Sequence, residues 1–572
     1  MLRIKINGTD ADIQGTSFRM VLNNPAFSED ALVGDHSYSV SFPGTEHNKM
    51  IFGFQHRSDI GFIAEAKFPI VINLHGNDVF SGTFTLDKAA EFFSGNIQAG
   101  ASALIALFEN MTTNQVDYGD TLNFPGSYEF NQYVDQAQES SYPDYNFTWF
   151  PVLNRNLFEG APEDVIAWWA EIQYINYTYD DRNLYVLFPY LPFVINSIFK
   201  SSGYRMNPNM FDSGELSTLV LYSPFRDTEY ESYKHNHKDH VGRFKIIELL
   251  NGIRSNFNVG FFTRYNSNEV NITPLKDLLI SDILDWTDKI VDIHERDFSY
   301  EYPDGYLFEY NWDSGCKTIS GFLKEKLDPA DYIVLPPVTT RSLLNIGNVS
   351  NEGAICLVLD ESAYYRYTVI APEPTEPPMP TFYSWSFFSY AFLKNQTSLG
   401  ERKTESTLST LLPSKRPGII FNDHPVPCSD QAIIDPEGFV SSQMMFHYWN
   451  RFNLKFLKDI KPRLLFYRGM NPISKAVFAS CDYNVGYGQF EMSLDWNGDH
   501  GLFAYWHKDW VSFLDSASLH IFKVMLTATD LINLDLRKRI QIGANLYLIR
   551  KIEVNLPMDA PASIELMRIN GR

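Results

Sequence analysis

The sequence predicts a β-rich α+β fold of several domains, with small β-barrel modules and short helices. Three observations predict it. The chain has 572 residues, which at about 150 residues per domain corresponds to about four domains. Aromatic residues make up 15% of the composition, and flat rings fit the pleated surface of a sheet. Short runs of alternating apolar and polar residues recur, most clearly near both ends of the chain.

Composition excludes several classes of protein. Hydrophobic residues make up 44% of the chain, enough for several cores, so disorder is not expected. The net charge of -22 opposes binding to nucleic-acid phosphates and to anionic membrane surfaces. We expect no signal peptide and no membrane span, because the start lacks an apolar core and no 18-residue apolar run occurs.

The four cysteines do not form a motif. Neighbouring cysteines lie 40 to 72 residues apart, so there is no CxxC pair for a metal or for redox chemistry. At this density a disulfide framework is not expected, and the thiols are predicted to be buried and free. They are Cys316, Cys356, Cys428 and Cys481.

The first predicted domain, 1–118, is β-rich. Apolar and polar residues alternate over 2–6 and again over 38–42, where a turn follows at Pro43. The stretch 64–86 reads as a hairpin around a polar turn. Helical spacing of apolar residues predicts a short helix over 101–111.

The second predicted domain, 119–240, is an irregular, aromatic-rich insert. Its clearest element is a helix over 191–199. Pro192 suits the first helical turn, where its missing N–H costs nothing, and Gly203 stands where a helix stop belongs.

The third predicted domain, 241–320, combines a helix with a hairpin. The amphipathic helix 244–257 has an apolar stripe, and its polar positions are expected to face away from the core. The stripe is Ile246, Leu250, Ile253 and Phe257, and the polar positions are Lys245, Glu248, Asn251 and Arg254. Two strands, 258–265 and 269–273, follow as a hairpin, and Pro274 starts another helical stretch.

Two further domains complete the prediction. The fourth, 321–430, is β-rich and contains a Pro-rich loop at 371–380, with five prolines in ten residues, followed by an aromatic-serine strand at 382–390. The fifth, 431–572, ends in short alternating strands compatible with a small barrel.

One histidine cluster is a candidate metal site. His235, His237 and His240 lie with Asp239 within six residues, and neutral imidazoles are zinc and nickel ligands. The lysines beside them oppose a cation, so a solvated loop is the favoured interpretation.

Other motif-like stretches fail in detail. The pair His294-Glu295 lacks the second histidine of HExxH, because Phe298 stands there. The stretch 495–499 imitates a calcium loop, but His500 and Trp506 occupy positions that need glycine and glutamate. No Walker A, no G-x-S-x-G and no complete G-x-G-x-x-G occurs. The sequence therefore predicts no catalytic residue, no cofactor and no metal, and hence no enzyme.

Three aromatic clusters leave two interpretations open. Exposed rings would stack on sugars, whereas buried rings would fill space between domains or subunits, which is the commoner case. The clusters are Trp168-Trp169, the run 382–390, and Trp496 with Trp506 and Trp510.

Four stretches together resemble the baseplate hub and tail-tip proteins of tailed phages. They are 38–53, 80–86, 244–273 and 524–549. The resemblance implies a homotrimer with two small β-barrel modules per subunit, so that six barrels match a sixfold tail tube. It departs from some relatives in one respect, because the chain carries no lysozyme or peptidase module.

The resemblance implies a structural role in the virion. The protein would be made in the host cytoplasm and assembled into the phage tail, connecting the tube to the tip and guiding genome ejection. Its partners would be the tail tube protein, other tail-tip or baseplate proteins and receptor-binding proteins, with viral DNA passing through without specific binding. The alternative is a glycan-binding or receptor-binding tail protein, with or without depolymerase activity.

Overall fold

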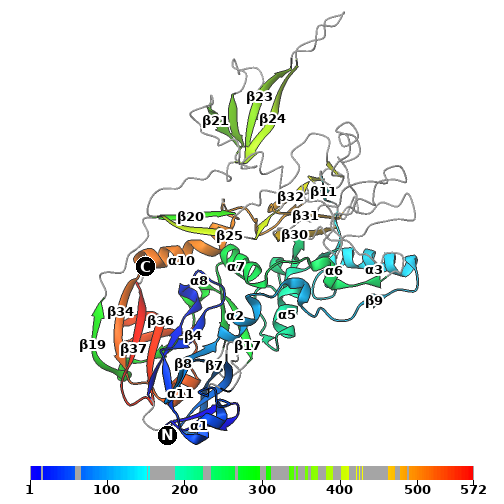
Figure 1. Ribbon diagram of the computed structural model, residues 1–572. Coiled ribbons are helices and arrows are strands. Elements are labelled where there is room, and N and C mark those ends of the chain that lie inside the picture. Colours follow the sequence, from blue (N-terminus) through cyan, green and yellow to red (C-terminus); the bar gives the residue numbers. More distant parts are fainter. Residues whose placement is uncertain are drawn as a thin grey trace, which may run out of the picture.

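The computed structural model is rich in β-strands and contains short helices (Figure 1). It describes residues 2–13, 17–57, 59, 66–150, 152–154, 187–222, 234–263, 268–296, 305–310, 334–339, 343–344, 354–358, 363–370, 382–390, 401–406, 408–410, 420–421, 424–425, 428–429, 462–470, 477–485, 488–496 and 498–570.

The N-terminal part is a set of antiparallel strands with two short helices. Its elements are β1 (Leu2–Ile6), β2 (Thr9–Asp10), β3 (Phe18–Asn23), β4 (Gly34–Ser37), β5 (Val40–Pro43), α1 (Glu46–Ile51), β6 (Lys67–Leu74), β7 (Asn77–Ala89), β8 (Phe92–Gly100) and α2 (Ser102–Phe108). The expected first strand, the hairpin and the helix are confirmed. The strand expected at 38–42 starts later, because the chain bends at Tyr38 when it leaves β4 and joins β8 as β5.

The central part mixes helices with short strands. Its elements are β9 (Leu122–Asn123), α3 (Ser127–Glu139), β10 (Phe147–Thr148), β11 (Leu153–Asn154), β12 (Phe188–Pro189), α5 (Leu191–Ser201), β13 (Arg205–Met206), β14 (Leu219–Tyr222), β15 (Lys234–His235), α6 (His237–Val241), α7 (Ile246–Phe257), β16 (Val259–Thr263), β17 (Glu269–Pro274), α8 (Leu275–Leu278), β18 (Ile283–Asp285) and β19 (Ile290–Arg296). The helix with Pro192 in its first turn is confirmed as α5, and Gly203 beyond its end has a φ of 78°.

The remaining elements run to the C-terminus. They are β20 (Gly305–Tyr310), β21 (Val334–Val338), β22 (Ile355–Val358), β23 (Ala363–Ile370), β24 (Phe382–Tyr390), β25 (Glu401–Ser406), β26 (Ser409–Thr410), β27 (Ile420–Phe421), β28 (His424–Pro425), β29 (Cys428–Ser429), β30 (Arg463–Met470), β31 (Val477–Ser480), β32 (Asn484–Val485), β33 (Gly488–Gln489), a π-helix (Phe503–His507), α10 (Lys508–Ser516), β34 (Ser518–Val524), α11 (Ala528–Ile532), β35 (Arg539–Ile542), β36 (Asn545–Leu556) and β37 (Ala562–Ile569).

One sheet of 14 strands unites the two ends of the chain. The junction is the antiparallel pair β3–β36, in register from Phe18 opposite Leu556 to Asn23 opposite Lys551. In Figure 1 the blue N-terminal strands and the red C-terminal strands lie side by side. The segments predicted as the first and last domains therefore share one sheet and one buried core.

The β-rich α+β class is confirmed. The C-terminal strands that were expected to form a small barrel form an open series instead. The strands β18, β35, β36, β37, β34 and β19 follow one another by hydrogen-bonded pairing. Its two end strands, β18 and β19, are consecutive in the chain, separated only by the short turn 286–289. Among the described residues no pairing joins β18 to β19, so the ring does not close.

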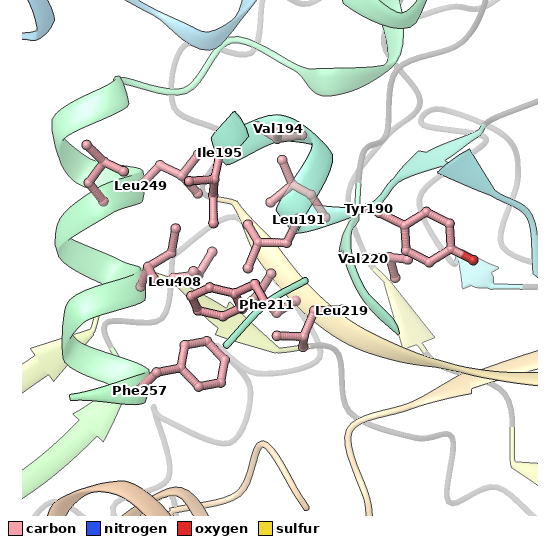
Figure 2. Packing of buried hydrophobic residues seen from close by; sticks show 14 of the residues in the cluster. Tyr190, Leu191, Val194, Ile195, Phe211, Leu219, Val220, Leu249, Phe257 and Leu408 are labelled. Atoms are coloured by element: carbon pink, nitrogen blue, oxygen red, sulfur yellow. The ribbon is translucent and has the colours of Figure 1, made fainter. Parts of the chain in front are cut away.

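A second core lies around α5 and α7. Figure 2 shows Leu249 and Phe257 on α7 facing Leu191 and Ile195 on α5, with Phe211 in the same cluster. The predicted stripe of α7 is fully buried here, together with apolar residues of the β16–β17 hairpin. The helix, the hairpin and the following short helix α8 are all confirmed.

The predicted exposure of Arg254 on α7 is wrong. It was expected to face solvent, opposite the apolar stripe, but it is buried. Its guanidinium donates to the backbone carbonyls of Val259, at 2.7 Å, and of Ser28. The reason is tertiary, because the N-terminal segment packs over the far side of the helix.

A four-stranded sheet, β21-β22-β23-β24, stands off from the rest of the molecule in Figure 1. The strand predicted at 382–390 is confirmed as β24 and pairs with β23. The Pro-rich loop 371–380 and the Trp168-Trp169 pair lie outside the described residues.

Candidate functional site

Two histidines of the cluster, His237 and His240, are packed in the interior, so for them the interpretation as a solvated loop is wrong. His237 and His240 are buried at the start and end of α6, whose first turn is capped by the side chain of Asn236. The ring of His237 lies 5.1 Å from the ring of Phe193 and 5.9 Å from that of Phe147. These rings come from other segments, so local polarity could not reveal the burial.

His237 is neutral over most of the pH range. Burial, with a smaller contribution from the neighbouring His240, lowers the pKa of His237 to about 4. Within the part of the chain that the structure describes, no group of three or more His, Cys, Asp or Glu side chains is placed to hold a metal ion.

A second buried histidine lies at the junction of three segments. His507 ends the π-helix, and its ring lies 4.7 Å from Phe308 and 5.4 Å from Trp496. Its Nε2 lies 3.3 Å from the carbonyl oxygen of Asn256 at the end of α7. Burial lowers the pKa of His507 to about 4, with a smaller contribution in the same direction from Arg254.

Because His237 and His507 have low pKa values, we expect the free energy of unfolding to fall in acid. Because the folded-state pKa lies below the ordinary 6.5, the unfolded chain binds more protons between pH 6.5 and 4. Stability is therefore full above pH 6.5 and falls toward pH 4, by about 3 kcal/mol for each histidine. In urea titrations from pH 7.5 to 4.5, His237→Gln and His507→Gln should each remove about 2–3 kcal/mol of that loss.

The exposed His36 provides the control for this experiment. His36→Gln removes one exposed imidazole and is the matched control for the substitution itself. A parallel pH profile for wild type and both buried-histidine variants would show that these imidazoles titrate normally.

The motif-like stretches occupy ordinary structural positions. Gly488 lies on β33 and pairs with Val485 on the antiparallel strand β32. His294 and Glu295 lie on strand β19, whereas HExxH requires a helix.

The tryptophans of the C-terminal part are interior residues. Trp496, Trp506 and Trp510 are each buried, which favours space filling over exposed sugar stacking for this cluster. The ammonium of Lys276 lies 4.4 Å from the centre of the Trp506 ring. Cys356 and Cys481 are free and buried, as predicted.

The most elaborate polar site is a buried ion pair that sequence reasoning missed. The Arg468 guanidinium on β30 pairs with Glu215, and their side chains are 1% and 9% exposed. Arg468 also donates to the carbonyls of Asp482 and Met492, at 2.7 and 2.8 Å. Glu215 in turn accepts from the backbone N–H of Glu491 at 2.7 Å. Burial lowers the pKa of Arg468, while Glu215 opposes this effect.

The arginine is also enclosed by rings. The rings of Phe466 and Phe490 both lie 4.3 Å from its guanidinium carbon. With its hydrogens directed at a carboxylate and two carbonyls, this group fixes three loops in one arrangement. The pair joins β30 to the segments that contain Glu215, Asp482 and Met492, which is the arrangement of a structural clamp.

A charged ladder covers the junction of the two chain ends. Arg19 on β3 lies 3.0 Å from Glu553 on β36, which in turn lies 2.6 Å from Lys551. Glu565 on β37 forms ion pairs with Arg550 at 2.8 Å and with Lys551 at 3.6 Å. The ladder crosses three adjacent strands and therefore favours their register, although exposed pairs each contribute little.

A small polar hollow lies beside the same junction. Its wall comes from the N-terminal, hairpin and C-terminal segments, and it has room for about one water molecule. The lining residues are Asn23, Pro25, Val33, Asp35, Phe262, Thr263, Asn271, Leu534, Asp535, Leu536 and Arg537. This is too small for a substrate. Among the described helices, none is long and apolar enough to cross a bilayer.

Comparison with known proteins finds likenesses among solved structures. No protein-family model and no curated protein matches the sequence. A crystal structure of the prophage MuSo2 43 kDa tail protein from Shewanella oneidensis aligns over 99% of this chain and 95% of that chain. The sequence identity is 8% and the TM-score is 0.31, so this likeness carries no weight in the functional argument.

Proposed function

We propose that the protein is a structural component of a phage tail, at the hub, tip or baseplate. The observation that carries the proposal is the convergence of the stretches that resemble hub proteins. Three of these four stretches, 38–53, 80–86 and 524–549, contribute strands to the same 14-stranded sheet, although more than 400 residues separate the first from the last. The fourth, 244–273, forms the helix and hairpin beside that sheet.

The described sites agree with a mechanical role. Two ion-pair networks hold distant segments together. They are the buried Arg468–Glu215 pair and the charged ladder on β3, β36 and β37. We therefore infer a protein without catalytic activity that joins the tail tube to the tip. The net charge of -22 supports passage of DNA, because an acidic channel wall repels phosphates and does not retain them.

A homotrimer is the assembly that we propose for this role. Mass photometry of the purified protein should give a species of three times the chain mass of 65.8 kDa. An antibody against the protein should label the tip of tailed particles by electron microscopy. A stable monomer that also appears singly in a tail reconstruction would contradict the trimer. Unlabelled particles, or a gene without tube and tape-measure genes nearby, would contradict the tail assignment.

The alternative is a receptor-binding or glycan-binding tail protein, with or without depolymerase activity. What favours it is the aromatic content of 15%, part of which lies outside the described residues. Zymography on host cell wall and capsule separates the two functions, because a clearing zone from purified protein supports the alternative and contradicts the structural role.

A further inference from the structure

Exposed apolar side chains gather along one continuous stretch of chain. From the end of α8 into the first residues of β19, Ile280, Ile283 and Val291 are 78%, 45% and 55% exposed. Met525, which follows β34, is 43% exposed, and its backbone N–H donates to the carbonyl of Lys289 at 2.9 Å. We call residues 280–292 together with Met525 the β18–β19 ridge.

Alternation along β18 fixes which side chains point outward. Leu284 and Trp286 pack into the core below the large sheet. Ile283 and Asp285 occupy the alternate positions along the chain and are exposed. The outward position of Ile283 is therefore set by the strand and by its parallel pairing with β35, not by a loose loop.

Residues 280–292 of the ridge carry four aspartates and one lysine. Asp282, Asp285 and Asp288 are exposed, and Asp282 is 85% exposed. The ridge's own cation, Lys289, is ion-paired with Asp530. Other cations also face the ridge. Lys538 lies 3.8 Å from Asp282, Lys523 lies opposite Asp292 across β19 and β34, and Arg539 donates from Nε to the carbonyl of Ser281 at 2.7 Å.

We propose that the β18–β19 ridge is the docking surface for a protein segment whose apolar side chains are flanked by lysine or arginine. Apolar side chains exposed along a short stretch and bordered by charge mark interaction surfaces, and cations on the partner complement the exposed carboxylates of Asp285 and Asp288. A second ridge from another copy is opposed, because the aspartates of both copies would meet. This inference rests on exposure and charge alone and is independent of the tail assignment.

Docking takes place through side chains rather than by strand addition. Strand β18 has only three residues, and β19 pairs with β34 through two register irregularities. Short and bulged edge strands resist pairing with a further strand.

Two synthetic peptides test the proposal on the full-length protein. Both carry a fluorophore and alternate valine with a charged residue, lysine in one and glutamate in the other. Fluorescence anisotropy at 50 mM salt should show binding of the lysine peptide and none of the glutamate peptide. Ile283→Ser/Val291→Ser should weaken binding at least tenfold, and Asp285→Asn/Asp288→Asn should weaken it by a similar factor and reduce its salt dependence.

Matched variants elsewhere on the surface separate the ridge from general attraction to an acidic protein. Leu107 is 46% exposed on α2, and Glu109 and Asp120 are exposed further along the chain. Leu107→Ser and Glu109→Gln/Asp120→Asn should leave the affinity within twofold of wild type. Equal weakening by these controls, equal binding of both peptides or binding of neither would overturn the proposal. Dissociation of a dimer by the ridge variants, measured by sedimentation without peptide, would assign the ridge to a second copy and overturn it as well.

Discussion

Glu215→Ala should destabilise the protein by about 3–5 kcal/mol, because it leaves the buried guanidinium of Arg468 without its carboxylate. It also removes the acceptor for the backbone N–H groups of Glu491 and Met492. The guanidinium keeps its two carbonyl acceptors and its two aromatic neighbours, which do not neutralise its charge. Urea unfolding followed by tryptophan fluorescence measures the free energy, and hydrogen exchange in β30 shows whether the loss is local.

The double variant Glu215→Ala/Arg468→Met sharpens the test. Removing both charges abolishes the desolvation penalty, so the double variant should recover a large part of the stability lost by the single one. On the exposed face of α7, Glu248 lies 3.6 Å from Lys245, and Glu248→Ala should cost less than about 1 kcal/mol. A single variant at Glu215 as mild as this surface control would mean that Arg468 is solvated.

Elements that are specified by neighbouring residues could be predicted from the sequence. The alternation in β1 gives buried positions at Leu2, Ile4 and Ile6 and exposed ones between them. The turn between β35 and β36 forms at Gly543, which has a positive φ of 59°. In these elements the periodicity and the turn residues decide the structure before any distant contact forms.

Features that depend on distant segments could not be predicted in this way. Glu215 and Arg468 are separated by 253 residues, and nothing in either local sequence indicates the other. The pairing of β3 with β36 is equally distant, and it joins segments that composition assigns to separate domains. His237 shows the same limit, because its polar neighbours indicate solvent while Phe147 and Phe193 bury it.

The candidate site follows the same division. An absence of catalytic motifs can be read from spacing, because HExxH and the calcium loop each require residues at fixed positions. An exposed apolar ridge cannot, because the sequence of β18 alone does not say which of Ile283 and Leu284 faces the core. Pairing with β35 decides that question.

Ile253→Asp should be the most damaging substitution in the second core, costing about 4 kcal/mol or more. Ile253 is fully buried on α7, in the cluster that contains Phe257, Val259 and Phe261. A carboxylate in this apolar cluster is desolvated, and the apolar contacts of the isoleucine are lost as well. The result should be protein that is unfolded or trapped in aggregates at 37 °C, measured by soluble yield and by circular dichroism.

A graded series at the same position keeps the prediction testable if that variant does not fold. Ile253→Val should cost about 0.5–1.5 kcal/mol and Ile253→Ala about 2–5 kcal/mol. Glu248→Asp places aspartate on the exposed face of the same helix and should cost only a few tenths of a kcal/mol through helix propensity. Burial raises the pKa of a carboxyl group, so the deficit of Ile253→Asp relative to Ile253→Asn should shrink as the pH falls toward 4. An aspartate variant that melts and assembles like wild type would show that this face of α7 does not pack against the β16–β17 hairpin.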